Sequence, residues 1–331
     1  MYELHFDDRG ELIEGSALPM LEGSPDVLLL THGWNNSAED ARELYRGLDA
    51  QLGQFGAPPV IGIFWPSKKF DTELGREFDA ALDSPMARQV LVGAMRAAVP
   101  HLDALSIFHT LPVEILLRRL AGAETLRHGL LNLSNLTTFY QMKERAGLIG
   151  RNGLAPVLDA LVRRYSAIRI HLAGHSFGAR LATSAADSVK APVRSLTLLQ
   201  GAFSHHAFSL SIAGIPGAFR TVVTQHKVTG PIAVTHTRND KAVGLAYALA
   251  ARVAGQEAAF WGDANDRFGG IGSNGAQRTP EAVQQSLLPA RSVYTFEPGR
   301  IHNLRADTFV SGHSDIVHKE IGWLLNRVIA A

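Results

Sequence analysis

Short runs of apolar residues alternate with longer amphipathic segments along most of this chain. The runs have the length of strands, and their continuous apolar character is typical of strands that are covered on both faces. They occupy residues 26–31, 59–65, 168–172, 195–200, 231–237 and 292–296. Because helical segments separate most of these runs, the pattern predicts an α/β fold with a doubly wound, mostly parallel sheet.

Amphipathic segments predict helices over residues 38–52, 137–165, 241–254 and 314–329, the second with an interruption near residues 147–153. A further helix should begin near Phe177. Ser37, with Asp40 three residues later, favours an N-cap for the first helix. Near the N-terminus, alternation around the turn Asp8-Arg9-Gly10 predicts a β-hairpin at the edge of the sheet.

The strand-helix rhythm stops between residues 67 and 136. Helical segments are expected here over residues 85–99 and 112–120, with no strand between them. We interpret residues 67–136 as a helical insertion over the carboxyl end of the sheet, acting either as a lid or as peripheral packing. The whole chain, residues 1–331, is then a single domain.

One predicted strand ends in a serine flanked by glycines, Gly174-His175-Ser176-Phe177-Gly178. A serine at the tip of a strand-to-helix turn is forced toward strained backbone angles, so its neighbours two positions away must be small. Such a turn exposes the hydroxyl above the sheet, near a helix N-terminus, where negative charge is stabilised. The alternative is a glycine-rich turn in which Ser176 only caps the helix.

A serine hydroxyl is a poor nucleophile at neutral pH and needs a base that is oriented by an acid. Asp240 is our candidate for the acid because it directly follows the strand at residues 231–237. In open α/β sheets, sites are built from the loops at the carboxyl ends of strands. Asp263 and Asp266 are alternatives from a later loop that does not directly follow a strand.

Position must also select the base, because the chain has 14 histidines. His313 lies after the last predicted strand and just before the terminal helix, which favours it as the base. His302 and His318 are the alternatives, the first close to the strand and the second inside the predicted helix. An oxyanion would need two backbone donors, for which Phe177 and Trp34 are our candidates.

Taken together, the motifs THGW, GHSFGAR, a strand followed by Arg-Asn-Asp, and SGHSD resemble those of the α/β-hydrolase family. The resemblance covers nearly the whole chain outside the insertion. It implies Ser176 as nucleophile, Asp240 as orienting acid and His313 as base, with Trp34 and Phe177 as oxyanion donors.

The chain departs from the family in the place of its insertion. The usual cap follows the strand that ends here at Gln200, whereas this chain has its long insertion after Trp65. Only a short apolar piece, residues 207–219, follows Gln200. Within and near it, Phe203, Phe208 and Ile212 with Ile215 favour a hydrophobic acyl group.

Composition and charge exclude several classes of function for this chain. Hydrophobic residues make up 46% of the chain and charged residues 19%, which is typical of a globular protein. The net charge of +1 leaves no basic footprint for nucleic acid or an anionic membrane. The absence of cysteine excludes disulfides, thiol catalysis and cysteine-ligated metal.

Targeting and cofactor motifs are also missing. No run approaches the ~18 apolar residues of a membrane span, and the N-terminus has no apolar signal core, so we expect a cytoplasmic protein. The histidines show no metal-binding spacing such as HExxH, and no glycine-rich phosphate loop is present, so we expect neither metal nor cofactor.

These observations favour a serine hydrolase that cleaves small-molecule or lipid carboxylic esters through an acyl-enzyme. Acyl transfer or amide hydrolysis would use the same groups, as would a lipase effector. A homologue that binds a ligand without catalysis is the alternative from another class, although it would have no use for the acid and the base. The oligomeric state stays open.

Overall fold

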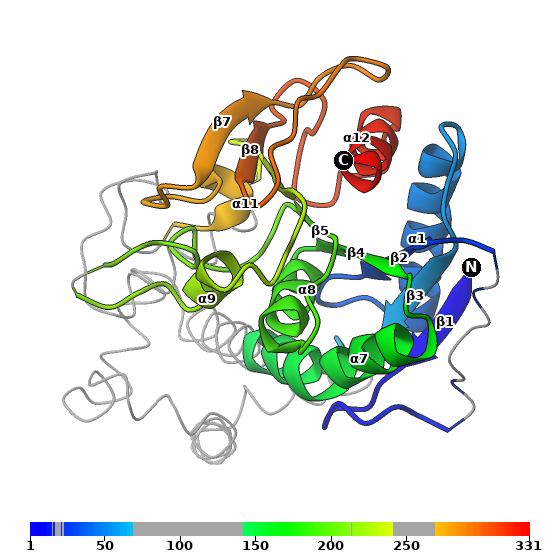
Figure 1. The fold of residues 1–331 in the computed structure, drawn as a ribbon. Helices are drawn as coiled ribbons and strands as arrows, with labels where there is room; N and C mark the ends of the chain where they lie inside the picture. The colour runs from blue at the N-terminus through cyan, green and yellow to red at the C-terminus, as the bar shows by residue number, and fades with distance from the viewer. Residues whose placement is uncertain (15, 17–20, 22, 69–141, 213, 241–268) are drawn as a thin grey trace, which may run out of the picture.

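The computed structural model describes residues 1–14, 16, 21, 23–68, 142–212, 214–240 and 269–331. Within these ranges eight strands form one sheet, in the order β1-β3-β2-β4-β5-β6-β8-β7, and all neighbouring strands are parallel (Figure 1). The strands are β1 (Tyr2–His5), β2 (Asp26–Thr31), β3 (Val60–Phe64), β4 (Arg169–His175), β5 (Ser195–Leu199), β6 (Ile232–His236), β7 (Ala282–Ser286) and β8 (Ile301–Arg305).

Both faces of the sheet are covered, as the side chains of β2 illustrate. Val27 and Leu29 belong to one buried apolar cluster, and Leu28 and Leu30 belong to another. The first cluster also contains side chains of α7 (Ala155–Arg164) and α8 (Phe177–Ser188), and the second those of α1 (Ala38–Gly53) and α12 (Lys319–Ala330). This arrangement confirms the predicted doubly wound α/β class.

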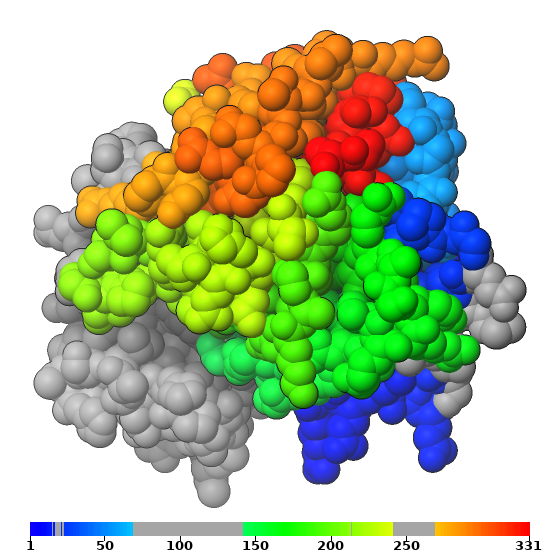
Figure 2. All heavy atoms as spheres, in the orientation of Figure 1, coloured from blue at the N-terminus to red at the C-terminus, as the bar shows by residue number. Residues whose placement is uncertain are grey.

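The helices α1 and α12 come from opposite ends of the sequence and pack side by side on one face of the sheet (Figure 1). Figure 2 shows the same contact in the filled molecule, where the red of α12 lies against the blue of α1. Two short helices, α9 (Arg220–Thr224) and α11 (Ile271–Asn274), belong to the long connections that follow β5 and β6.

The N-terminal segment lies at the sheet edge as predicted, but its pairing differs from a simple hairpin. The strand β1 pairs in parallel with β3, and the chain that returns after the turn at residues 8–10 makes a single antiparallel bridge between Leu12 and Phe6. The strand β1 pairs with β3 because β3 is a fully buried strand that meets all four residues of β1. The chain that returns after the turn meets it only at the bridge between Phe6 and Leu12.

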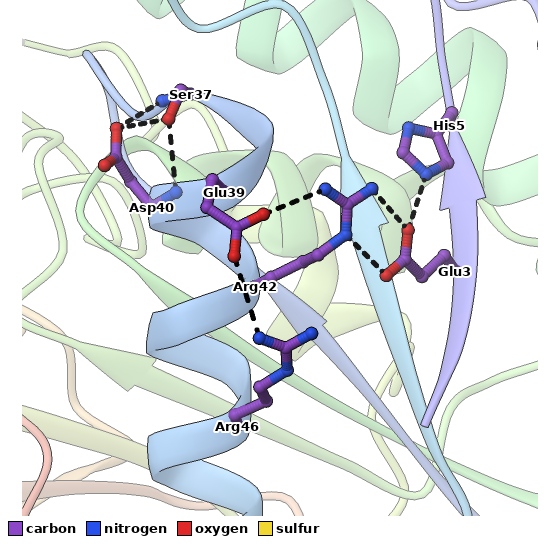
Figure 3. A network of polar contacts seen from close by, with 7 residues as sticks. All are labelled: Glu3, His5, Ser37, Glu39, Asp40, Arg42 and Arg46. Carbon is purple, nitrogen blue, oxygen red and sulfur yellow. Dashed lines mark hydrogen bonds and ion pairs between the residues drawn. The ribbon is translucent and has the colours of Figure 1, made fainter.

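Polar contacts attach β1 to α1 (Figure 3). The Arg42 guanidinium donates from Nε and Nη2 to the two carboxylate oxygens of Glu3, at 2.8 and 2.9 Å, and His5 contacts the same carboxylate at 3.0 Å. At the start of α1, Ser37 and Asp40 exchange hydrogen bonds between side chain and backbone, which confirms the predicted N-cap.

The prediction of a strand at residues 292–296 is wrong, because those residues form a loop. Its aromatic residues made it look like a strand, but Tyr294 and Phe296 stack on each other, with ring centroids 5.2 Å apart. The strand that the structure contains here is β8, which the hydrophobic pattern did not predict because two of its fully buried residues, His302 and Asn303, are polar. The Asn303 amide is satisfied by the backbone of Ala276, through contacts of 2.8 and 3.0 Å.

Two predicted helices have different limits in the structure. The last helix, α12, begins at Lys319 and not at residue 314, because Asp315 accepts from the backbone N–H and hydroxyl of Ser311 and holds a separate turn. The expected interruption of the earlier helix is a π-helical segment, η2 (Ile149–Leu154), between helical residues 142–148 and α7. A Cβ on Gly150 would lie 2.4 Å from the Leu181 carbonyl oxygen, so η2 packs unusually close to α8.

Several predictions lie outside the described residues. These are the insertion from residue 69 onward with its helices at 85–99 and 112–120, the start of the helix at 137–141, and the helix at 241–254. The alternative acids Asp263 and Asp266 fall there too. Among the residues that are described, no helix is both long and apolar enough to cross a membrane.

Candidate active site

The strand order reverses beside β2. From β2 the chain passes through α1 to β3 on one side, whereas β4 lies on the other side of β2. The helices α1 and α8 therefore cover opposite faces of the sheet, and the loops that follow β2 and β4 lie next to each other at its carboxyl edge. In open α/β sheets, ligands bind at such a reversal point. The predicted residues Trp34 and Ser176 lie in these two segments.

Ser176 occupies a strained turn between β4 and α8. Its backbone angles are φ 58° and ψ −122°, which a residue with a side chain rarely adopts. A Cβ on Gly178 would lie 2.3 Å from the Thr31 carbonyl oxygen, and one on Gly174 would lie 2.5 Å from the carbonyl carbon of Gly178. The predicted need for small residues at both positions is therefore confirmed.

The structure brings Ser176, His313 and Asp240 into one series of hydrogen bonds. His313 Nε2 lies 2.8 Å from Ser176 Oγ, and His313 Nδ1 lies 2.8 Å from Asp240 Oδ2. The Asp240 side chain is fully buried, while the His313 side chain keeps 18% of its surface exposed. Because an ionised carboxylate only accepts, Nδ1 carries the ring proton and Nε2 can accept one from the serine hydroxyl. The three side chains thus have the geometry that a nucleophile, a base and an orienting acid would require.

The loops that carry Asp240 and His313 hold each other in place. Asp307 Oδ1 accepts from the Thr237 hydroxyl and from the Arg238 backbone N–H, both at 3.0 Å. The Asn239 amide donates to the Val310 carbonyl, also at 3.0 Å. The sequence analysis missed these residues, because their partners lie about seventy positions away along the chain and no local pattern marks them.

His175 is a second contact of His313 that the sequence analysis missed. Its Nε2 donates to the backbone carbonyl of His313 at 2.8 Å, and the two ring centroids are 4.9 Å apart. Burial, with the nearby His313 as a smaller cause, lowers the pKa of His175 to about 3. The ring therefore stays neutral near physiological pH, and its position next to Ser176 in the motif was the available signal.

The loop after β2 approaches the serine closely. A Cβ on Gly33 would lie 2.8 Å from the Cβ of Ser176, so only glycine allows this approach. Just before it, His32 stacks on Trp65, whose indole N–H donates to the His32 carbonyl at 2.9 Å, and burial lowers the pKa of His32 to about 4. The loop is thus held by neutral, buried aromatic contacts.

The two predicted oxyanion donors lie next to each other at the reversal point. The rings of Trp34 and Phe177 contact each other, with centroids 6.2 Å apart. Phe177 is the first residue of α8, so its N–H lies at a helix N-terminus, where negative charge is favoured. Their role toward an oxyanion stays a prediction.

The alternative bases lie elsewhere. His302 is buried in β8 and contacts the backbone of Glu297. His318 is the N-cap residue of α12, not a residue inside it, and its ring lies 2.7 Å from Asp315. Among the described residues, no group of three or more histidine, aspartate or glutamate side chains could hold a metal ion.

No protein-family model, curated protein or solved structure matches this chain.

Proposed function

We propose that the protein is a serine hydrolase of the α/β-hydrolase type that cleaves carboxylic esters through an acyl-enzyme. The observation that carries the proposal is the hydrogen-bonded series from Ser176 through His313 to Asp240, built on a strained turn at the carboxyl edge of the parallel sheet. Each of these side chains alone could be structural. A buried carboxylate that orients a histidine toward a strained serine has a direct use in nucleophilic catalysis.

In the first half of the reaction, Ser176 Oγ attacks the ester carbonyl carbon while His313 Nε2 takes the hydroxyl proton. The carbonyl π electrons move to the oxygen, and the N–H groups of Trp34 and Phe177 stabilise the resulting oxyanion. Asp240 stabilises the imidazolium. When the carbon–oxygen bond to the alcohol breaks, His313 transfers its proton to the leaving oxygen, and the acyl group remains on Ser176.

In the second half, His313 removes a proton from a water molecule as that water attacks the acyl carbon. The second tetrahedral intermediate then expels Ser176 Oγ, which recovers its proton from His313. The sum is ester plus water giving acid plus alcohol, and the protein returns to its starting state.

A fluorophosphonate probe tests this proposal, because it labels a serine only when a base activates it. We expect mass spectrometry to find the label on Ser176 and no label on the Ser176→Ala variant. The variant should also lose a factor on the order of a thousand or more in its rate of p-nitrophenyl butyrate hydrolysis, as is typical when a nucleophilic serine is removed. Ser188→Ala, at an exposed position near the end of α8, is the matched control and should keep both. A folded, unlabelled wild-type protein would overturn the proposal.

A further inference from the structure

A cavity of about 280 Å³ lies beside the segment that follows β5. One part of its wall is apolar and includes Phe203, Ile212 and Ile215. Another part is formed by Lys143, from the helical residues 142–148, and by Arg180, from α8. None of the described residues that line the cavity is acidic. The described part of the lining is therefore amphipathic, and its charged side chains are both cationic.

The two cations of this wall are held close together. Arg180 Nε donates to the backbone carbonyl of Lys143 at 2.8 Å, and its guanidinium lies 5.5 Å from the centre of the Phe219 ring. Burial, and then the charge of Arg180, lower the pKa of Lys143 to about 8. Glu144 lies 3.7 Å from Arg180, but its side chain is 57% exposed and does not line the cavity.

Two neighbouring cations in a partly dehydrated wall destabilise each other, and an anion bound between them would remove that repulsion. Charge-assisted hydrogen bonds from such groups are among the stronger polar contacts in proteins. Ser209 adds a buried hydroxyl on the same cavity, with no hydrogen bond to any described residue. A ligand with several oxygen acceptors could therefore use all three side chains.

Backbone contacts link the cavity to the proposed nucleophile, although Ser176 is not among the described lining residues. The Ala202 N–H donates to the Ser176 carbonyl at 3.0 Å, and the following residue, Phe203, already lines the cavity. Arg180 follows Ser176 by about one helical turn. Ile215, which lines the cavity, is 71% exposed, which leaves an apolar edge where an aliphatic chain can continue.

We propose that this cavity binds the anionic end of an amphiphilic ester substrate, a carboxylate or phosphate joined to an aliphatic chain. Lys143 and Arg180 bind the anion, while Phe203, Ile212 and Ile215 contact the chain. As a substrate subsite of Ser176, this assignment rests on the proposed hydrolase function. It predicts that anionic esters bind better than neutral esters of the same length.

Binding is measured on Ser176→Ala protein, so that no turnover occurs, with dansylaminoundecanoate as the fluorescent probe. We expect saturable binding that octanoate or octyl phosphate displaces and octanol does not, and the tighter competitor identifies the anionic group. Adding Lys143→Met should weaken probe binding about tenfold or more. Lys190→Met, an exposed lysine beyond α8, is the matched control and should leave binding unchanged. Equal displacement by octanol, or equal affinity in the Lys143 variant, would overturn the inference.

Hydrolysis then connects the cavity to Ser176. The mono-p-nitrophenyl ester of octanedioic acid should have a lower KM than p-nitrophenyl octanoate, and Lys143→Met should abolish the difference. Labelling of Ser176 by fluorophosphonate without this preference overturns the inference alone. Anion binding in a protein whose Ser176 is never labelled overturns the hydrolase proposal, and with it the substrate role of the cavity.

Discussion

At the scale of single residues, the site depends on close backbone contacts that would not accommodate larger side chains. Ser176 keeps its left-handed backbone because Gly33, Gly174 and Gly178 allow neighbouring segments to approach where any side chain would collide. His313 is constrained from two directions, since Asp240 holds its ring and His175 holds its backbone. The packing around Ser176 thus holds its backbone in a conformation that is strained by itself.

His175 is predicted to act as a positioning residue. His175→Phe keeps a buried ring but removes the hydrogen bond to the His313 carbonyl, so His313 should populate the productive geometry less often. We expect kcat for ester hydrolysis to fall roughly two- to tenfold, as for the loss of one hydrogen bond, with KM and the melting temperature nearly unchanged. His5→Phe, at the sheet edge, is the control and should keep full kcat. A parallel loss of stability and activity would indicate a purely structural role for His175.

At the scale of elements, each central strand of the sheet is hydrogen-bonded to a strand on both sides, whereas an edge strand is bonded on one side only. The strand β1 has four residues and a single strand neighbour, β3, so its side-chain contacts with α1 matter more than they would inside the sheet. The hydrogen bonds from Arg42 lower the pKa of Glu3 to about 2, which keeps this contact ionised over most of the acid range.

Arg42→Met should loosen β1 selectively. We expect faster amide hydrogen exchange over Tyr2–His5 in this variant, while exchange in the central strand β2 stays as in the wild type, because only the edge loses a contact. Arg46→Met is the matched control: Arg46 is 67% exposed and lies 3.7 Å from Glu39 (Figure 3). Unchanged exchange in β1, or a change throughout the sheet, would contradict this prediction.

At the scale of the whole molecule, buried histidines couple stability to pH. Burial lowers the pKa of His32 and His236 to about 4 and that of His175 to about 3. An unfolded chain binds protons on these rings near pH 6.5, so between pH 6.5 and about 4 the unfolded state holds more protons than the folded state. The free energy of unfolding therefore falls as the pH falls through this window.

Urea unfolding at pH 7, 6 and 5 measures this dependence. We expect the midpoint to decrease toward pH 5, with each buried histidine contributing on the order of 1 kcal/mol per pH unit inside the window. His236→Gln removes one titrating ring away from Ser176 and should make the decrease shallower. A midpoint independent of pH, or the same slope in the variant, would show that these rings do not control acid stability.

The sequence by itself determined the features that depend on near neighbours. Alternating apolar runs and amphipathic segments predict the parallel α/β class, because each segment is long enough to show its own period. The Gly-x-Ser-x-Gly turn is equally local, since the small residues that Ser176 requires stand only two positions away in the sequence. The N-cap at Ser37 and the positions of five buried strands were predictable for the same reason.

Only the tertiary structure decided what depends on distant partners. Asp240 and His313 were predicted from their positions after strands, but they are 73 positions apart, and the hydrogen bond between them depends on loops joined through Asp307 and Val310. The strand β8 escaped detection because buried polar residues pair with backbone elsewhere, which no local hydrophobic pattern can record. Strand order and the cationic cavity likewise arise from packing between segments far apart in sequence, where burial and charge are properties of the assembled fold.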